Sequence, residues 1–302
     1  METKRLLLSD RDKIRKKWGK TPSDVEEYIA IIKEWIKMQK HLPELPEDNM
    51  IEYVLTVCKY SIESSKQNLE MYYSMHQMLP EFFIHPLKHN LVEVVSKMGY
   101  IATLPNLDEN LSRITMLKFH REGIEIFDPY KLAAYVSAIL EIRLQEDLGM
   151  GEVLVCDAEH LAMGHVVKFT PSFFKKCTLL LEALLKNRLK GIHIINYPPY
   201  INTILAVAKM FLKKKIYDRI HLHTNIESLY KSIPREMLPI DYGGDEKAMK
   251  TIMDLWQLKL EQYAKRFDFI EKMEIKESLR AKPLMNTEVL GYYGNFKKLD
   301  VD

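Results

Sequence analysis

The stretch GIHIINYPPYINTILAVAKMFLKKKIYDRIHLH, residues 191–223, holds a long apolar segment between two short runs rich in isoleucine. At 100° per residue, six apolar side chains of the long segment fall on one face of a helix, which is the pattern of a helix packed on a core. The opposite face is also mostly apolar, with only Asn202 and Lys209 as a narrow polar strip. The sequence therefore predicts a helix that is apolar nearly all round.

Two interpretations of this helix are open. It is either buried on both sides inside a large domain, or covered part of the time by something other than the protein, such as a membrane surface or an apolar ligand. The basic cluster Lys213, Lys214, Lys215 and Arg219 directly after the helix favours contact with anionic lipid. A solvated helix end whose cations complement the helix dipole gives the same pattern.

The composition narrows the class of protein. The chain has 302 residues, 47% of them hydrophobic, which suits about two domains with real cores. Its 44 basic and 42 acidic residues give a net charge of +2, so the overall charge does not indicate a nucleic-acid partner. The N-terminal METKRLLLSDRDKIRKKW lacks the apolar core of a signal peptide, and no run reaches the roughly eighteen apolar residues of a membrane span. We expect a cytoplasmic monomer.

The order of predicted elements changes along the chain. Scarce glycine, 11 residues, favours helices over tight turns. Helical spacing predicts three helices in the first ninety residues, at 21–42, 50–60 and 61–83. Short β-rich runs then alternate with long helical patterns, at 113–119, 152–157, 191–197 and 219–223. Such alternation implies right-handed crossovers, so the fold class is α/β, with a small, mainly parallel sheet covered by helices and an all-α N-terminal domain.

Motifs for catalysis are missing. No glycine-rich phosphate loop follows a predicted strand, and no Gly-x-Ser-x-Gly nucleophile turn occurs. Asp157, Glu159 and His160 follow a strand where catalytic groups often gather, but polar residues also cap loops at such places. Gly243 and Gly244 most simply make a turn. We expect no catalytic residue, no enzyme activity and no cofactor.

Metal binding and disulfides are not expected either. His221 and His223 lie two residues apart on one face of a predicted strand, with His193 on the preceding strand, but no third ligand of matched spacing is evident. The three cysteines, at positions 58, 156 and 177, are an odd number in apolar surroundings without paired spacing. They are interpreted as reduced core residues.

Three segments carry a family resemblance, in the order and spacing of that family over about 90% of the chain. The chain resembles the lipid-binding CRAL-TRIO (Sec14-like) family, in the branch of α-tocopherol transfer protein and cellular retinaldehyde-binding protein. The resemblance implies a helical N-terminal domain at 1–90, a CRAL-TRIO lipid-binding domain at 91–275 and a C-terminal tail at 276–302. The segments are FTPSFFKKC (169–177), residues 189–223 and LPIDYGG (238–244).

The resemblance implies an intracellular carrier. The helix from Pro199 to about Leu212 would be a mobile lid over an apolar pocket whose floor is the sheet. The protein would bind a tocopherol-, retinoid- or carotenoid-like molecule and transfer it to phosphoinositide-containing membranes, with reversible, peripheral membrane association. Alternatives are a phospholipid exchange protein and a phosphoinositide-sensing trafficking adaptor.

The resemblance also implies site residues. Phosphoinositide head groups would bind Arg188, Lys190, Lys215 and Arg219, while Cys58 stands where relatives have an arginine, which leaves head-group selectivity open. Tyr135 and Ser137 are candidates for a hydrogen bond to a ligand hydroxyl or aldehyde. The predicted ligand pocket comprises Tyr135, Ala138, Phe169, Phe173, Cys177, Leu180, Leu181, Leu184, Ile192, Ile194, Ile201, Ile204, Leu205, Ala208 and Phe211.

Overall fold

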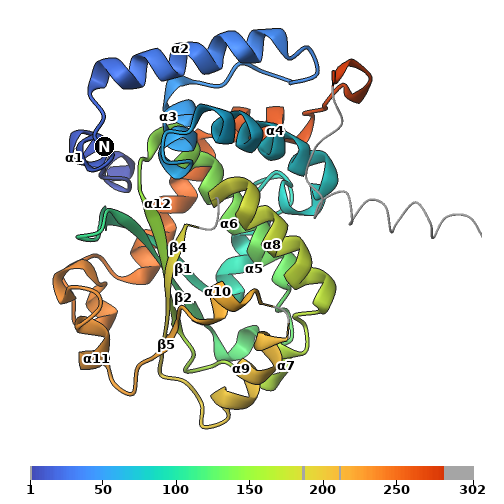
Figure 1. Ribbon diagram of the computed structural model, residues 1–302. Coiled ribbons are helices and arrows are strands. Elements are labelled where there is room, and N and C mark those ends of the chain that lie inside the picture. The colour runs from blue at the N-terminus through green and yellow to red at the C-terminus, as the bar shows by residue number, and fades with distance from the viewer. Residues whose placement is uncertain (1, 186–187, 211, 282–302) are drawn as a thin grey trace, which may run out of the picture.

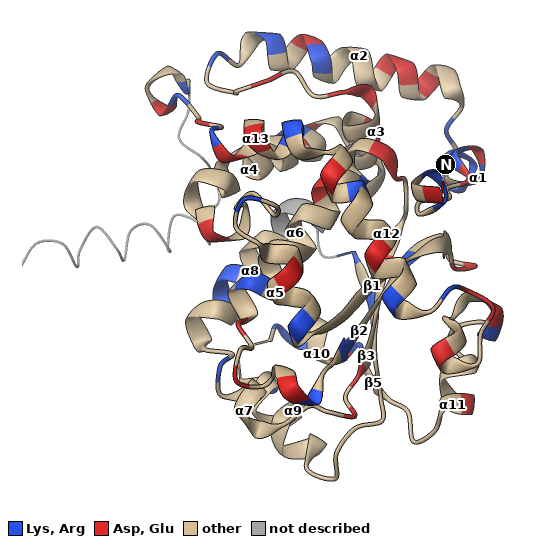
Figure 2. Ribbon diagram, turned by 180° about the vertical axis from the view of Figure 1, so that it is seen from behind, with Lys and Arg blue, Asp and Glu red and all other residues tan. Residues whose placement is uncertain are grey.

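An N-terminal layer of helices lies across one end of a sheet in the computed structural model, which describes residues 2–185, 188–210 and 212–281, with the backbone only for 182–185 (Figures 1 and 2). Acidic and basic residues are interspersed over these helices (Figure 2). The helices of this layer are α1 (Arg11–Lys17), α2 (Pro22–Met38), α3 (Asp48–Val57) and α4 (Ile62–Met78).

Local signals explain where these helices begin. The Thr21 side chain accepts from the Asp24 backbone N–H while the Asp24 carboxylate accepts from the Thr21 N–H, which makes a capping box before Pro22 at the first position of α2. Ser61 caps α4 by accepting from the Ser64 N–H. The three helices predicted for the first ninety residues are confirmed as α2, α3 and α4.

A five-stranded sheet forms the centre of the remaining chain, with its strands in sequence order. β2 to β5 run parallel, and β1 pairs antiparallel with β2. The predicted α/β class with a mainly parallel sheet is confirmed. The strands are β1 (Gly99–Leu107), β2 (Ser112–Phe119), β3 (Gly151–Asp157), β4 (Leu189–Ile195) and β5 (Ile220–Leu222).

The strand β1 is not among the predicted strands. It lies at the edge of the sheet and contains Pro105, which lacks a backbone donor and is tolerated in edge strands. Its pairing with β2 is irregular between Thr103 and Leu107. A proline and a pairing irregularity weaken the strand pattern, and this explains why the sequence alone does not reveal it.

Right-handed crossovers between neighbouring parallel strands place the connecting helices on one face. Figure 1 shows α6, α8 and α10 on that side of the sheet, and α11 and α12 on the other side. Trp256 of α12 is fully buried, and its indole N–H donates to the Thr103 carbonyl at 2.9 Å. These helices are α5 (Leu91–Met98), α6 (Pro129–Glu146), α7 (Met163–Val166), α8 (Pro171–Leu185), α9 (Ile201–Lys209), α10 (Lys214–Tyr217), α11 (Ile226–Tyr230), α12 (Met249–Gln262) and α13 (Ala264–Glu271).

The turn predicted at Gly243 and Gly244 is confirmed. Gly243 adopts a φ of +73°, and a Cβ atom on Gly244 would clash with the Leu238 carbonyl oxygen. Tyr242, just before the turn, donates its hydroxyl to the Asp157 carboxylate at 2.9 Å. The turn therefore ties this segment to the end of β3.

Candidate functional site

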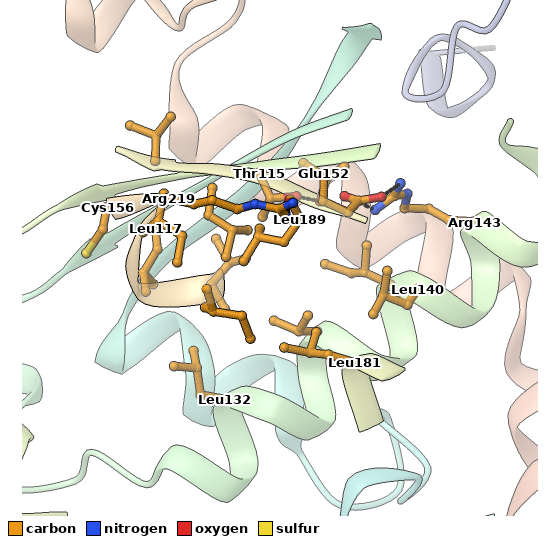
Figure 3. A pocket seen from close by; sticks show the side chains of 18 of the residues that line it. Thr115, Leu117, Leu132, Leu140, Arg143, Glu152, Cys156, Leu181, Leu189 and Arg219 are labelled. Atoms are coloured by element: carbon orange, nitrogen blue, oxygen red, sulfur yellow. Dashed lines mark hydrogen bonds and ion pairs between the residues drawn. The ribbon is translucent and has the colours of Figure 1, made fainter. Parts of the chain in front are cut away.

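The floor of a cavity is made by alternate residues of the sheet. Because side chains alternate between the two faces of a strand, residues in register form rows across neighbouring strands. Thr103, Thr115, Leu154 and Ile192 form one such row, from β1 to β4. All four line a cavity of about 270 Å³ between the sheet and the helices (Figure 3).

The opposite wall of the cavity comes from helices. α8 contributes Leu181 and α10 contributes Ile216. The lining residues of α6 recur at spacings of four, three, one and three, which is one helical stripe. They are Leu132, Val136, Ile139, Leu140 and Arg143.

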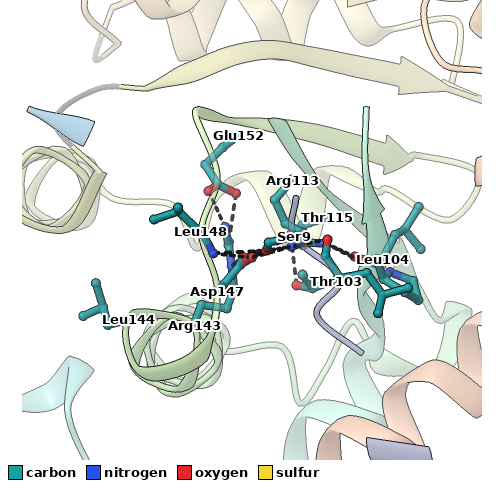
Figure 4. A network of polar contacts seen from close by, with 12 residues as sticks. Ser9, Thr103, Leu104, Arg113, Thr115, Arg143, Leu144, Asp147, Leu148 and Glu152 are labelled. Atoms are coloured by element: carbon teal, nitrogen blue, oxygen red, sulfur yellow. Dashed lines mark hydrogen bonds and ion pairs between the residues drawn. The ribbon is translucent and has the colours of Figure 1, made fainter. Parts of the chain in front are cut away.

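A buried ionic network closes one end of the cavity. Arg143 donates through both terminal nitrogens to Glu152, at 2.9 and 2.5 Å, and both side chains line the cavity (Figure 3). The Nε atom of Arg143 also donates to Asp147 at 3.0 Å, and Arg113 donates to the same carboxylate (Figure 4). The four side chains pair with one another, so this end is polar in composition without offering an isolated charge.

The same network fastens the N-terminal segment to the sheet. The Ser9 hydroxyl donates to Asp147 at 2.7 Å, and the Asn49 amide donates to the Leu144 carbonyl at 2.9 Å. Although burial favours the protonated carboxyl, the guanidinium groups of Arg113 and Arg143 hold the pKa of Asp147 well below its usual range. A charged Asp147 therefore joins β2, α6 and the N-terminal segment.

A second pocket, of about 290 Å³, is basic. It lies between the end of α3 and the strands β4 and β5, and within the described part of the chain no acidic residue lines it. The structure brings all four predicted phosphoinositide-binding residues together here. The pocket is lined by Arg188, Lys190, Lys215 and Arg219, together with Val57, Cys58, Lys59 and Ser64.

Several cationic side chains lie close together in this basic pocket. Burial lowers the pKa of Lys190, and the neighbouring charges of Arg188 and Arg219 lower it further. Arg188 is held by its Nε–H, which donates to the Val57 carbonyl at 2.8 Å, and its guanidinium lies 5.6 Å from the Trp18 ring centroid. A bound anion would relieve the repulsion, so the arrangement suits a phosphate group.

Lys59 and Ser64 were not predicted as site residues. Lys59 and Tyr60 follow α3 with φ values of 56° and 57°, a left-handed conformation that costs roughly 1–2 kcal/mol per non-glycine residue. The buried Tyr60 ring packs at 6.2 Å from Tyr28, which supports the conformation. The signal in the sequence was the position of Lys59 beside Cys58, the residue that the family resemblance had already connected with this site.

Lys215 and Arg219 line both cavities. The two residues lie in and just after the single-turn helix α10, which leads into β5. A guanidinium nitrogen of Arg219 donates to the Leu189 carbonyl of β4. The apolar cavity and the basic pocket therefore share one wall.

The helix α9 covers the sheet beside the cavity. Its inner residues Ile201, Ile204 and Leu205 pack with Ile192 and Ile194 of β4. The exposed residues of α9 are Asn202, Thr203, Ala206 and Lys209, and Met210, just after α9, is 76% exposed. The inner side of α9 is therefore apolar as predicted, whereas its exposed side is mixed and more polar than the sequence pattern indicated.

Further exposed apolar side chains lie near α9. The Tyr200 hydroxyl, which precedes α9, donates to the Leu161 carbonyl before α7, and Lys168 donates to three carbonyls of the 124–127 loop. These contacts place α9, α7 and the loop at one end of the molecule (Figure 1). We call the exposed residues there the apolar patch: Ile126, Met163, Val167, Tyr200 and Met210.

The predicted pocket residues occupy several places. Leu181 and Ile192 line the cavity, whereas Ile194, Ile201, Ile204 and Leu205 form the cluster under α9. Ala208 is half-buried on α9. Phe211 and the Leu184 side chain lie outside the described residues. Phe169, Phe173, Cys177 and Leu180 pack in the core between α8 and the N-terminal helices.

Tyr135 and Ala138 lie in the core cluster that includes Trp256. On α6 they are one residue away from the lining positions Val136 and Ile139, so they face a different side of the helix. The Ser137 hydroxyl is satisfied by the Ala133 carbonyl at 2.9 Å. Tyr135 is buried, and its hydroxyl has no partner among the described residues.

The other candidate groups have structural partners. Asp157 accepts from Tyr242, from the Asn196 amide at 3.1 Å and from the Glu159 N–H at 3.1 Å. The three cysteines form no disulfide with one another. No group of His, Cys, Asp and Glu side chains suited to a metal ion occurs in the part of the chain that the structure describes.

The three histidines stack on one another. His193 Nδ1 lies 2.8 Å from His223 Nε2, and the His193 ring centroid lies 5.1 Å from that of His221. Burial, followed by the charges of His223 and His221, lowers the pKa of His193 to about 4. The His193 ring is therefore neutral at pH 7, and its contacts with His221 and His223 join β4 to β5.

Comparison with known families divides the chain into two parts. Residues 97–244 match the CRAL/TRIO domain, and residues 21–86 match the Pinta-like UBA domain. Among the residues described, no helix is long and apolar enough to span a membrane.

Named relatives point to the same family. The chain is 25% identical to "Alpha-tocopherol transfer protein-like" of Mus musculus over 94% of its own length and 82% of that protein. It is 29% identical to "Clavesin-2" of Homo sapiens over 60% of its length and 54% of that protein. The crystal structure of Sfh5, 12% identical, aligns with a TM-score of 0.43 over 67% of this chain and 74% of that one. From the domain match and the named relatives, residues 97–244 belong to the CRAL-TRIO family.

Proposed function

We propose that the protein carries a hydrophobic small molecule of the tocopherol, retinoid or carotenoid kind in the apolar cavity and delivers it to phosphoinositide-containing membranes. The observation that carries this proposal is the wall of Lys215 and Arg219, which the apolar cavity and the basic pocket share. The name of the mouse relative, "Alpha-tocopherol transfer protein-like", supports the ligand class. No covalent step is required.

Delivery would depend on α9. Its inner side covers the sheet beside the cavity, and the residues that flank it, Tyr200 and Met210, belong to the apolar patch. Opening α9 in water would expose apolar surface, which costs about 25 cal/mol of free energy per Å². Opening α9 against a membrane avoids this cost, because the same surface then contacts lipid. Membrane contact therefore favours the open form.

The basic pocket would couple membrane recognition to release. A phosphoinositide head group bound there contacts Lys215 and Arg219, and these side chains also line the ligand cavity. Moving them toward the phosphate changes the wall of the apolar cavity. Head-group binding and ligand binding are then linked, each changing the affinity for the other by the same factor. The protein would work in the cytoplasm as a monomer that binds membranes reversibly.

The shared wall also favours a second candidate, phospholipid exchange. One phospholipid could place its acyl chains in the apolar cavity and its phosphate in the basic pocket, since Arg219 borders both. This candidate predicts that the protein holds a single amphiphile rather than an apolar ligand plus a membrane head group.

Native mass spectrometry of the purified protein, followed by organic extraction, tests both candidates. A single apolar isoprenoid or phenolic lipid supports the carrier, and a diacyl phospholipid supports exchange. Protein that is empty, and that takes up neither α-tocopherol, retinal nor phosphatidylinositol from vesicles, would overturn both.

A further inference from the structure

Two threonines form a hydroxyl pair in the floor of the apolar cavity. Thr103 of β1 and Thr115 of β2 are register partners, and their Oγ1 atoms lie 3.0 Å apart. Both residues line the cavity. Thr103 is only 1% exposed, whereas Thr115 is half-buried. The Thr115 hydroxyl is therefore the member of the pair that the cavity reaches.

One of the two hydroxyl protons has no acceptor within the pair. Each hydroxyl carries one proton and two lone pairs, so one threonine donates to the other and the second proton needs a further acceptor. Within the described part of the chain, the only hydrogen bond of either hydroxyl is the one that joins them. Because Thr103 is the more deeply buried, it donates to Thr115, and the Thr115 proton is left for the cavity.

The surroundings of the Thr115 hydroxyl determine which ligands the cavity binds well. The neighbours of the pair that line the cavity floor, Ile101, Leu117 and Leu154, are apolar. Arg113, two residues before Thr115 on β2, uses its guanidinium on Asp147 and on the Leu104 carbonyl. The Arg143 and Glu152 side chains are already bonded to each other. A pure hydrocarbon in the cavity would remove water from Thr115 and leave its proton unmatched, which costs more than a hydrogen bond gains.

We propose that Thr115, oriented by Thr103, selects ligands that present an oxygen acceptor to the floor of the cavity. The ligand class is a lipid with a long apolar chain and one hydroxyl, ether or carbonyl oxygen, in preference to a hydrocarbon of the same shape. This inference rests on the proposed carrier function, and it names the specificity of the same cavity.

The experiment is a competition between matched ligands. Delipidated protein is mixed with equal amounts of phytol, phytyl methyl ether and 2-phytene, the hydrocarbon that lacks only the oxygen, and native mass spectrometry measures the bound fractions. We expect phytol and the ether to be preferred about tenfold over 2-phytene. The ether is included because it can only accept, as the assigned donor role of Thr115 requires.

The double variant Thr103→Val/Thr115→Val should reduce the preference to near unity. Valine keeps the shape of threonine, and removing both hydroxyls leaves neither one unsatisfied, so the variant should fold. The matched control is Ile101→Val, which removes a methylene from the same floor without changing its polarity. It should weaken the binding of all three ligands equally.

The outcomes separate this inference from the carrier function. Equal binding of the three ligands to the wild type, a preference for phytol alone, or a preference that survives in the folded double variant would overturn the role of Thr115 while the carrier function stands. If the wild type binds none of the three, nor α-tocopherol nor retinal, the carrier function fails and this inference fails with it.

Discussion

The apolar cavity and the basic pocket are nearly equal in volume, about 270 and 290 Å³, and share one wall, yet they are built in different ways. The apolar cavity lies inside the fold and ends at the buried pair of Arg143 and Glu152. The basic pocket is lined at the surface, where Lys59 and Lys215 are exposed. Changes to the buried ionic end of the apolar cavity should therefore affect stability, and changes to the exposed cations of the basic pocket should affect membrane binding more than stability.

Breaking the closed end of the apolar cavity should have the largest effect. Arg143→Met leaves the Glu152 carboxylate buried without its bidentate partner and removes one of the two guanidinium groups from Asp147. We expect a loss of about 3–5 kcal/mol in the free energy of unfolding, because an unpaired buried charge is costly. Urea denaturation measures this loss.

The matched control for that variant is Lys97→Met, which removes an ion pair with Glu93 on the surface. Both side chains are more than 60% exposed, so we expect a loss below about 0.5 kcal/mol. A loss below about 1 kcal/mol for Arg143→Met would show that the network does not hold this end of the cavity.

Reversing charges in the basic pocket should leave folding intact. Lys59→Glu/Lys190→Glu, at two exposed residues that line only the basic pocket, should weaken binding to phosphoinositide vesicles at low salt by roughly 100-fold, since each cation near an anionic surface contributes roughly 1 kcal/mol. Binding of an apolar ligand in solution should change by less than about threefold. Vesicle co-sedimentation and ligand titration give the two numbers.

Lys37→Glu/Lys250→Glu makes the same change in net charge on α2 and α12, away from the pocket. This control should reduce vesicle binding by less than about threefold at the same salt concentration. An equal loss in both double variants would mean that overall charge, and not the basic pocket, attracts the membrane.

Acidic pH should destabilise the contact between β4 and β5, the strands beside the shared wall. The pKa of His193 is about 4 in the folded protein against about 6.5 in the unfolded chain, so only the unfolded chain gains a proton as the pH falls between these values. Stability is therefore lost from about pH 6.5 down to pH 4, by about 2 kcal/mol for this group. The other titratable groups that contact His193 are His223 and His221, and α11 contributes the neutral Ser228 to the cluster.

The variant His193→Asn removes this titration and keeps a polar side chain. Its free energy of unfolding, measured against pH, should fall less steeply between pH 6.5 and 4 than that of the wild type. Parallel curves for the two proteins would show that the histidine cluster does not control the acid response.

The two cavities also differ in how far the sequence predicts them. Arg188, Lys190, Lys215 and Arg219 were all assigned to one site, and one pocket contains all four. Charged residues are costly to bury, so they remain at the ends of elements, where only a few arrangements bring them together. The family resemblance was then enough to select the arrangement.

The positions of apolar residues in the fold are not restricted in this way. Both sides of α6 are apolar, and the pattern does not tell whether Tyr135 or Val136 faces the cavity. The floor residue Thr103 was missed because its strand, β1, was not recognised. Which apolar face lines a cavity depends on packing between distant elements, and local spacing does not contain that information.

The smallest expected effect concerns the outer side of α9. The apolar patch contains Val167 and Met210, which are 71% and 76% exposed. The variant Val167→Ser/Met210→Ser should lower partition into uncharged vesicles by roughly fivefold, because less apolar surface is removed from water on docking. Uncharged vesicles keep the basic pocket from masking this change. The free energy of unfolding should stay within about 0.5 kcal/mol of the wild type.

Met38→Ser/Leu258→Ser provides the comparison for this last variant, because these residues of α2 and α12 are also exposed, by 69% and 49%, and lie outside the apolar patch. If general hydrophobicity draws the protein to vesicles, the two double variants lose partition equally, and the patch has no special role. If α9 meets the membrane, only the patch variant loses partition. In that case Val167 and Met210 are apolar although they are exposed to water, because their second environment is lipid.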